Sequence, residues 1–428
     1  MYNKVLIVGA GPAGLCLALA LARQGTQVAL LERQAEDLLG SPAGDGREVA
    51  LTHASMRFLR EIGVWAHIPS ADVVPLRQAR ILDRHDPGFE VSARPFDRDQ
   101  LGTLVSNHLI RAAAWRAASE HPHIHIHTGS SVERVMTSPS TAHVQLAGGK
   151  TLDAALLVAA DGRHSQTRRA MGIATYMHDF GRSMLLCRMT HEQPGDGTAW
   201  QWFGRDMTRA ILPVSEHVSS VILTMPEAAM QPLLDLSQTD FAQAVARHLE
   251  YRFGAMELTG ERHSYPMVGT WARRFVGTRF ALVGDAAIGM HPVTAHGFNT
   301  GLASAERLAW AAAFGQRRWQ DVGHPRALAR YERQHRLGSA AMFAGTQLVA
   351  RLFENDSLLA RPLRQGIMRA GRDLPVLQRA LAAGLLDEAP RPASLPHQLR
   401  RTLDILRPRR RHADRRAATP PPTAGTQA

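Results

Sequence analysis

Two glycine-rich segments, at 9–14 and 284–301, carry residue types that suit a nucleotide cofactor. The first segment, GAGPAG, places Gly9, Gly11 and Gly14 in the spacing GxGxxG. The second segment, GDAAIGMHPVTAHGFNTG, combines glycines with one acid, Asp285, and two histidines. Glycine turns bring backbone N–H groups close to phosphates, and an acid beside them can accept hydrogen bonds from sugar hydroxyls. The chemistry to be expected is that of a bound dinucleotide.

The elements around the first segment support this interpretation. An apolar run at 4–9 predicts a strand, and helical spacing of apolar residues predicts a helix from 12 to 24. Gly9 suits the tight turn between them, Gly11 lets the backbone approach a pyrophosphate, and Gly14 lets the helix pack closely on the strand. The N-terminus of the helix then offers free N–H groups to the phosphates.

A second predicted strand at 27–31 ends at Glu32. An acid at the end of this strand accepts hydrogen bonds from ribose hydroxyls and repels a 2′-phosphate. Strand, glycine loop, helix, strand and acid in this order predict dinucleotide binding. This segment alone leaves NAD and FAD open.

Length and composition limit the class of protein. The chain has 428 residues and 45% hydrophobic content, enough for two or more packed domains. Cys16 and Cys187 are too few for a disulfide framework and show no metal-ligand spacing, so we expect packing residues in a reducing compartment. The N-terminus lacks a signal-peptide pattern, and no apolar run is long enough to span a membrane. We expect a cytoplasmic protein without a metal site.

The formal charge of +12 is almost all arginine, since only Lys4 and Lys150 are lysines, and such a bias weakens a nucleic-acid interpretation. Eight arginines and two aspartates lie between 400 and 416. Because this stretch and the following residues have little apolar surface, we predict a mostly disordered basic tail at 401–428. Two uses stay open: contact with anionic lipid or another protein, and a solvated tail without a role.

Alternation of apolar and polar residues between 184 and 225 predicts antiparallel strands, which we expect to join residues 73–97 in a substrate sheet. From about 340 to 386 the pattern is helical, and core packing is favoured over contact with the site or a membrane. The run HPHIHIHT at 121–128 fits a half-buried strand with outward histidines better than a metal site, because no carboxylate or cysteine is close in sequence.

Further segments resemble the fingerprints of the class A flavoprotein monooxygenases. They are GDGREVALTH (44–53), VAADGRHSQTRR (158–169) and the second glycine segment preceded by RFALVG. The resemblance covers about residues 1–400. It implies an α/β fold of the glutathione-reductase-like FAD-binding type, in which a Rossmann-type parallel sheet carries an inserted antiparallel substrate domain and C-terminal helices. The implied divisions are an FAD-binding domain (1–72, 98–176 and 270–340), a substrate-binding domain (73–97 and 177–269), a C-terminal helical region (341–400) and the tail (401–428).

The resemblance also assigns roles to single residues. It implies that Asp285 binds the ribityl chain of FAD, that Asp161 and Gly162 lie near the pyrophosphate and serve NAD(P)H, and that Arg47 and Asn107 contact FAD. Independently, an apolar strand at 280–283 broken by Gly284 places Asp285 at a strand's carboxyl end, where open α/β sheets bind ligands. The expected cofactor-binding set is Gly9, Gly11, Ala13, Gly14, Glu32, Arg33, Arg47, Asn107, Asp161, Gly162, Gly284, Asp285, Pro292, Gly297 and Asn299.

Within this class, GDGREVALTHASMRFLREIGVW, LGTLVSNHLIR and HPVTAHGFNTG resemble the ubiquinone-biosynthesis hydroxylases. Most of these relatives read HPIAGQGFNLGLRD at the last motif, whereas this chain has TAH at 294–296 and Ser304 in place of the aspartate. The TAH variant resembles the demethoxyubiquinol hydroxylases. The resemblance implies FAD as cofactor, NAD(P)H as transient co-substrate, and O₂ added to a lipophilic phenol or quinol through a flavin hydroperoxide. It leaves open the ring position, NADH against NADPH, the oligomeric state, and contact with the inner membrane or a biosynthetic complex.

Pro292 and His296 are the candidate catalytic residues. Pro292 fixes φ and removes one N–H, while Gly297 allows the backbone to lie close to the flavin ring. His296 is either a proton-handling group or a structural partner of the flavin loop. The lack of a second GxGxxG and of a CxxC argues against a disulfide reductase. Two alternatives remain: an FAD-dependent reductase of the geranylgeranyl-reductase type, and a non-catalytic subunit that binds quinone.

Overall fold

The structure, a computed structural model, describes residues 3–83, 86–204, 206–291, 296–354, 360–374, 378 and 382. The chain divides into two compact units, Met1–Glu388 and Ala389–Ala428, and the described residues all belong to the first. The basic tail predicted at 401–428 and the candidate residue Pro292 lie outside the described residues.

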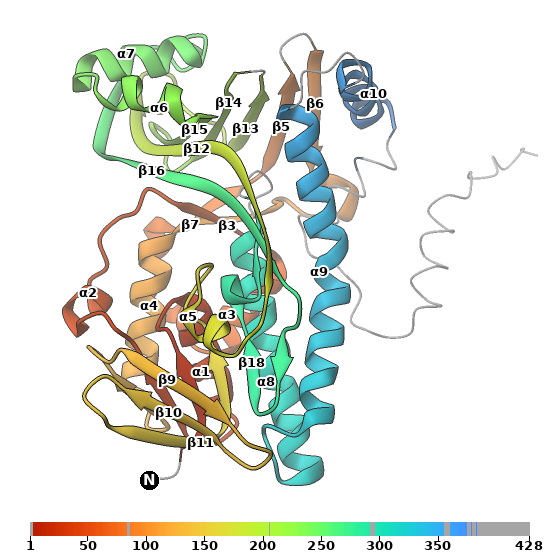
Figure 1. Ribbon diagram of the computed structural model, residues 1–428. Helices are drawn as coiled ribbons and strands as arrows, with labels where there is room; N and C mark the ends of the chain where they lie inside the picture. The colour runs from red at the N-terminus through yellow and green to blue at the C-terminus, as the bar shows by residue number, and fades with distance from the viewer. Residues whose placement is uncertain are drawn as a thin grey trace, which may run out of the picture. The chain divides into compact units, whose positions relative to one another are not determined.

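A largely parallel sheet forms the core of the N-terminal half (Figure 1). Its strands follow the order β17-β18-β11-β1-β2-β8, and all neighbours are parallel except β17 and β18. Two antiparallel strands, β10 and β9, extend it beside β11. The bounds are β1 Asn3–Val8, β2 Val28–Leu31, β8 Ile124–His127, β9 Val132–Thr137, β10 Ala142–Leu146, β11 Thr151–Ala159, β17 Val276–Gly277 and β18 Phe280–Leu282.

The central strands of this sheet are apolar throughout because both of their faces are covered. Helix α1 lies against both α4 and α8. The helices of this part are α1 Pro12–Ala22, α2 Glu36–Gly40, α3 His53–Glu61, α4 Asn107–Ser119, α5 Gln166–Ala170 and α8 Gly297–Trp319. This arrangement confirms the predicted Rossmann-type sheet.

A second, mainly antiparallel sheet has the order β19-β16-β12-β15-β14-β13-β5-β6. Only β13 and β5 run parallel, and their pairing brings the segment around residue 80 beside a strand that comes much later in the chain. The bounds are β5 Gln78–Asp83, β6 Asp86–Ser92, β12 Thr175–His191, β13 Thr198–Phe203, β14 Thr208–Pro213, β15 Val218–Pro226, β16 Met256–Ala272 and β19 Ile288–Gly289. The long strands β12 and β16 run from this sheet to the parallel one (Figure 1).

Two helices, α6 (Glu227–Leu234) and α7 (Gln238–His248), bury one face of the second sheet in a separate apolar cluster. The opposite face is therefore available to a ligand. A small third sheet of order β3-β7-β4 is built from Glu48–Leu51, Gly102–Ser106 and Val74–Leu76. Short 3-10 turns complete this part: η1 Val64–His67, η2 Ser70–Asp72, η3 Arg94–Phe96 and η4 Gly284–Ala286.

Two C-terminal helices follow, α9 (Pro325–Glu354) and α10 (Ala360–Asp373). Helix α9 passes along both large sheets (Figure 1) and is tied to the parallel sheet where the buried Tyr331 hydroxyl donates to the Leu282 carbonyl at 2.6 Å. It crosses residue 340 unbroken, so no change of secondary structure marks the boundary expected there. Among the helices of the described residues, none has the length and apolar content needed to cross a membrane.

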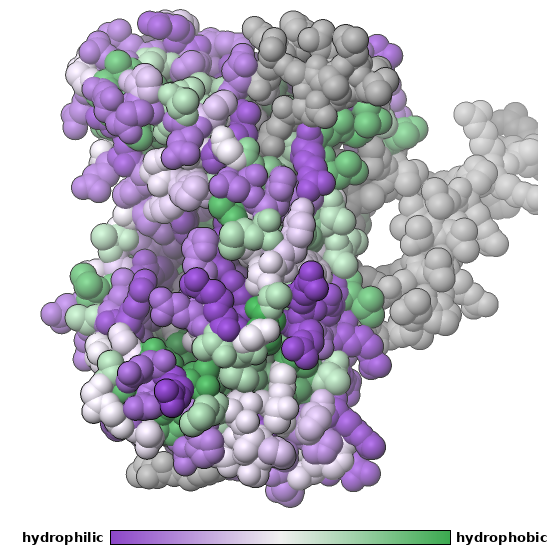
Figure 2. Space-filling view, viewed as in Figure 1, coloured by the Kyte–Doolittle hydropathy of each residue, from purple (hydrophilic) through white to green (hydrophobic). Residues whose placement is uncertain are grey.

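The surface seen in Figure 2 is mostly polar, with hydrophobic residues in scattered small groups. The histidine run contributes β8, in which Ile124 is buried and His125 is exposed, while the ring of His123 lies 3.1 Å from the Gln27 amide. Over the described part of the chain, no three histidine, cysteine, aspartate or glutamate side chains cluster in a way that could hold a metal ion.

Candidate active site

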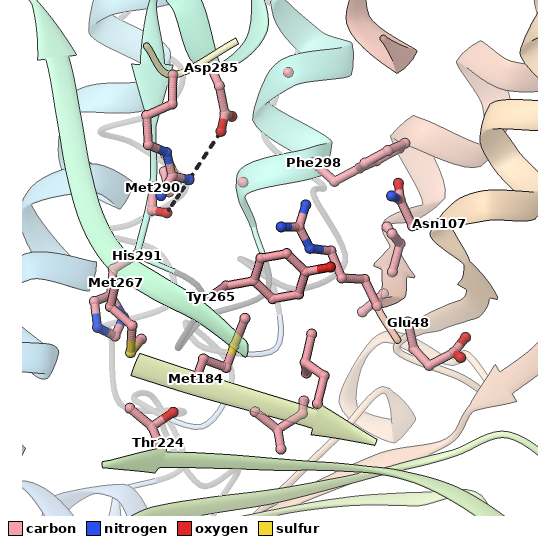
Figure 3. A pocket seen from close by; sticks show the side chains of 18 of the residues that line it. Glu48, Asn107, Met184, Thr224, Tyr265, Met267, Asp285, Met290, His291 and Phe298 are labelled. Atoms are coloured by element: carbon pink, nitrogen blue, oxygen red, sulfur yellow. Dashed lines mark hydrogen bonds and ion pairs between the residues drawn. The ribbon is translucent and has the colours of Figure 1, made fainter. Parts of the chain in front are cut away.

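A cavity of about 660 Å³ extends from the N-terminus of α1 to the open face of the second sheet. Its wall includes the glycine loop, the segments at 47–50 and 160–164, strands β12 to β16, the segment 284–302 and the end of α9. Figure 3 shows the side chains that point into it, with Asp285 on one side and Met184, Met267 and Thr224 toward the sheet.

The glycine loop has the geometry that a pyrophosphate requires. Gly9 has a φ of +107°, and a Cβ there would lie 2.5 Å from the Ala160 carbonyl oxygen. A Cβ on Gly14 would lie 2.0 Å from the Gly9 oxygen, so helix and loop are in close contact. Gly11 lines the cavity and a Cβ there would meet no atom within 4 Å. The side-chain space of Gly11 thus opens where the first-turn N–H groups of α1 face the cavity, and these residues fit a bound dinucleotide.

Glu32 is held against this loop. One carboxylate oxygen accepts a hydrogen bond from the Ala10 backbone N–H at 2.8 Å, and the other accepts from the Gln34 N–H at 2.9 Å. The carboxylate therefore sits at the end of β2 beside the loop, where a ribose would bind. Arg33 next to it is exposed.

In the segment after β11, one residue holds the local turn and its neighbours line the cavity. The Asp161 carboxylate accepts hydrogen bonds from the Ser165 hydroxyl and from the Thr167 N–H, the latter at 3.0 Å, and so holds the turn that starts α5. Gly162, with a φ of +82°, and Arg163 line the cavity. Within this fingerprint, Ala160, Gly162, Arg163 and His164 line the cavity, whereas Asp161 holds the turn.

Arg163 was not foreseen as a site residue. Its Nη2 donates to Oδ2 of Asp285 at 3.0 Å and to the Met290 carbonyl at 3.4 Å (Figure 3), while Nη1 donates to the Val268 carbonyl at 2.6 Å. One guanidinium thus joins the loop after β18 to β16 of the second sheet. The only sequence signal was its place directly after Gly162.

Close packing fixes the position of Asp285. Gly284 has a φ of +60°, its N–H donates to the Ser304 hydroxyl at 2.8 Å, and a Cβ there would lie 2.7 Å from that of Ala13. Gly301 of α8 lies against Gly284 from the other side. The loop is therefore clamped between α1 and α8, and the carboxylate of Asp285 points into the cavity with its side chain 38% exposed.

Asn299, a candidate cofactor contact, lies on the first turn of α8. Its side-chain oxygen accepts from the Thr52 N–H at 3.1 Å, and its Nδ2 donates to the Ala50 carbonyl at 2.8 Å. This buried amide ties α8 to β3, next to the cavity wall at Ala50.

Arg47, Asn107 and Tyr265 line the cavity, and Figure 3 labels Asn107 and Tyr265; all three contact Asp45. The Asn107 amide donates to the Asp45 carboxylate at 2.7 Å, and the Tyr265 hydroxyl donates to the Asp45 carbonyl at 3.1 Å. The guanidinium carbon of Arg47 lies 4.1 Å from the centre of the Tyr265 ring. Burial raises the pKa of Tyr265, so its hydroxyl stays protonated and can donate.

A buried ion pair joins the substrate sheet to the small sheet. The Glu48 carboxylate, 3% exposed, lies 2.6 Å from Nη2 of Arg188, and Ser106 donates to its second oxygen at 2.9 Å. Sequence reasoning missed this pair, because the two residues are 140 positions apart. It fixes strand β12, whose neighbouring residues Met184 and Leu186 line the cavity.

The two histidines of the second glycine segment occupy different places. His291 lines the cavity and is buried, with its ring 4.5 Å from that of Phe180 in an edge-on contact. His296 is half-buried at the start of α8, where its carbonyl accepts from the Thr300 N–H at 2.9 Å. Gly297 beside it lines the cavity.

The sheet side of the cavity is mostly apolar. Alternate residues of β12 to β15 point to the same face, as the two-residue period of strands requires. The residues that this sheet contributes are Met184, Leu186, Gln201, Phe203, Thr208, Ala210, Leu212, Ile222 and Thr224. This wall can hold a lipophilic ring and offers a few hydroxyl and amide groups to orient it.

A dinucleotide cradle that opens into a largely apolar chamber is the arrangement of a nucleotide-dependent enzyme with a small-molecule site. The pattern of the FAD binding domain family matches residues 2–344, and the chain belongs to that family. It is an FAD-dependent monooxygenase. The solved structure of p-nitrophenol 4-monooxygenase PnpA from Pseudomonas putida DLL-E4 has the same fold, with a TM-score of 0.74, 16% identity, and coverage of 90% of this chain and 98% of that one.

Three similar proteins indicate a narrower class of monooxygenase. The chain is 42% identical over 390 residues to ubiquinone hydroxylase UbiM of Neisseria meningitidis, covering 90% of this chain and 85% of that protein. It is 33% identical over 394 residues to ubiquinone hydroxylase UbiL of Rhodospirillum rubrum, with 91% and 92% covered. It is 28% identical over 390 residues to 3-demethoxyubiquinol 3-hydroxylase of Escherichia coli K12, with 90% and 98% covered. The predicted family and hydroxylase activity are thereby confirmed.

Proposed function

We propose that this protein hydroxylates the ring of a prenylated phenol or quinol in ubiquinone biosynthesis, with a demethoxyubiquinol-type quinol as the leading substrate. The observation that carries the proposal is the continuous cavity that joins the glycine cradle to the apolar face of the second sheet. Cofactor and ring can therefore lie next to each other within one cavity. The names of the three relatives support the choice of substrate.

FAD, when bound and reduced by NAD(P)H, would activate O₂ so that one oxygen atom enters the ring and the other leaves as water. Gly11 and the N–H groups at the start of α1 would hold its pyrophosphate, and Glu32 would hold a ribose. Asp285 would accept hydrogen bonds from the ribityl hydroxyls. Gly297 would let the backbone lie close to the flavin ring.

The remaining cavity residues bind and shield the substrate. Met184, Leu186 and Ile222 exclude water, which protects a reactive oxygen species from unproductive decay. Thr224 and Gln201 are placed to hydrogen-bond ring oxygens. Pro292 and His296 stay candidates for shaping the flavin side and for proton handling.

We also propose a division into an FAD-binding part and a substrate-binding part with the boundaries given above, and the presence of two large sheets supports it. Because a prenylated quinol partitions into lipid, we also propose that the protein works in the cytoplasm at the surface of the inner membrane.

Quinone profiling tests the function. A strain without this gene should accumulate a precursor that lacks one ring hydroxyl or the methoxy group made from it, and the wild-type gene should restore normal quinone. Asp285→Ala should fail to restore it, whereas the surface change Arg169→Gln should succeed. A normal quinone profile in the deletion strain would reject the assignment.

A further inference from the structure

The cavity ends at two stacked phenylalanines. The rings of Phe203, at the end of β13, and Phe353, near the end of α9, have their centres 3.8 Å apart with planes inclined by 25°. Both side chains line the cavity and both are at most 7% exposed. They come from elements far apart in the sequence, so this contact exists only because α9 lies across the open face of the second sheet.

Beyond the pair, the apolar surroundings continue toward α10. Phe203 and Phe353 share a cluster with Met368, which is fully buried, and with the partly buried Ile367. One turn before Ile367 on the same helix, Leu363 is 55% exposed. The apolar packing around the pair therefore continues from β13 and α9 to α10.

The opposite end of the cavity has a different character. Arg47, Asn107, Arg163 and Asp285 line it, and an aliphatic chain placed there would strip water from charged groups. A long apolar substituent on a ring bound at the sheet would thus leave by the phenylalanine end, where it displaces no water from polar groups.

We propose that Phe203 and Phe353 flank the path of the isoprenoid tail and make the site selective for substrates that carry one. The inference rests on the proposed function for the identity of the tail. The aromatic faces contact the methyl and methylene groups of the chain, so affinity depends on the tail as well as on the ring. A polar side chain in the same place would lose this contribution and leave ring binding unchanged.

The test compares two quinones, one with a short isoprenoid tail and one without a tail, in equilibrium dialysis against the FAD-loaded protein. Phe353→Gln and Phe203→Gln should each weaken binding of the tailed quinone by about tenfold, and binding of the tailless quinone by less than about twofold. Phe353→Leu, which stays apolar, should bind both quinones nearly as the wild type does. In turnover with the matching quinols, the glutamine variants should have a higher KM for the tailed quinol. Their kcat for the tailless quinol should equal that of the wild type.

Equal losses for tailed and tailless quinones would overturn the proposal, since a general packing defect has no reason to distinguish them. Unchanged binding of the tailed quinone in both glutamine variants would overturn it as well. Thermal unfolding and the flavin spectrum show whether each variant is folded and contains FAD. If one glutamine variant does not fold, the other glutamine variant is compared with Phe353→Leu and with the wild type. Because dialysis does not depend on turnover, a tail preference in a protein that hydroxylates neither quinol would reject the proposed function and keep this inference.

Discussion

Nη2 of Arg163 lies 3.0 Å from Oδ2 of Asp285, and the same guanidinium holds the carbonyl of Val268 in the substrate sheet. The second oxygen of Asp285 has no protein partner within the described residues, and we propose that it accepts a hydrogen bond from a cofactor hydroxyl. We propose Arg163 as a positioning residue, because it orients the Asp285 carboxylate and joins the loop after β18 to β16 of the second sheet.

Replacing Arg163 by Met should weaken FAD binding by about tenfold, because Asp285 loses its orientation and the site loses one positive charge near an anionic cofactor. Titration of apoprotein with FAD, followed by flavin fluorescence, measures the loss. Arg163→Lys should recover part of the affinity. Arg169→Gln, at an exposed arginine on the same segment, should bind as the wild type does. Equal affinities for Arg163→Met and wild type would remove Arg163 from the site.

Two glycines of the first loop should respond differently to alanine. Gly14→Ala puts a Cβ 2.0 Å from a backbone oxygen, so we expect a loss of about 3 kcal/mol in the free energy of unfolding. Gly11→Ala meets no protein atom and should change stability by less than about 0.5 kcal/mol, yet weaken FAD binding by about tenfold or more. Denaturant unfolding of the apoproteins and FAD titration separate the two effects. Normal FAD affinity in a folded Gly11→Ala protein would contradict the placement of the pyrophosphate.

This glycine pattern was predictable from the sequence because its requirements are local: three glycines, the adjoining strand and helix, and an acid at the end of the next strand. The same holds for Asp285, which follows a short apolar strand. The contacts of Arg163 and Glu48 could not be predicted from the sequence. Their partners lie 122 and 140 positions away, and the spacing of apolar residues does not indicate such distant contacts.

Asn299 shows the converse limit of sequence reasoning. The motif that contains it includes the cavity residue Gly297, and the Asn299 amide binds backbone groups 247 and 249 positions away. Which side of a helix a polar residue serves depends on tertiary packing. The sequence pattern alone could not show that Asn299 holds α8 to β3.

His296→Ala should raise the fraction of NAD(P)H oxidation that ends as hydrogen peroxide, by about twofold to tenfold, with a matching fall in hydroxylated product. The physical reason is that His296 begins α8 directly beside Gly297, which lines the cavity. Peroxide and product are measured against NAD(P)H consumed. His125→Ala, on the edge strand β8, serves as the control. If His296→Ala showed the same ratio of peroxide to product and the same rate of NAD(P)H oxidation as the wild type, His296 would have only a structural role.

Stability should fall in mild acid because of a buried histidine. His335 is fully buried, its Nδ1 lies 2.9 Å from Nη1 of Arg307, and burial holds its pKa well below the usual 6.5. Below pH 6.5 the unfolded chain binds a proton at this histidine, whereas the folded protein does not. The free energy of unfolding therefore decreases as pH falls. The loss grows as pH falls further below 6.5, because a larger share of the unfolded chains is protonated at this histidine.

Denaturant unfolding at pH 7.5 and pH 5 measures this difference, and His335→Gln should reduce it. Burial also lowers the pKa of His191 and His248, so part of the acid sensitivity should remain in the variant. If the free energy of unfolding changed equally with pH in wild type and His335→Gln, His335 would not contribute to the acid sensitivity.

We propose that one cavity holds FAD and a quinol ring, so that oxygen from O₂ enters the ring. The most direct measurement is mass spectrometry of the product formed by purified, FAD-loaded protein from NAD(P)H, ¹⁸O₂ and a tailed demethoxyquinol. We predict a product heavier by one ¹⁸O atom, formed only when NAD(P)H is present. A product without ¹⁸O, or one in which double bonds of the tail are reduced, would contradict the account and indicate a reductase.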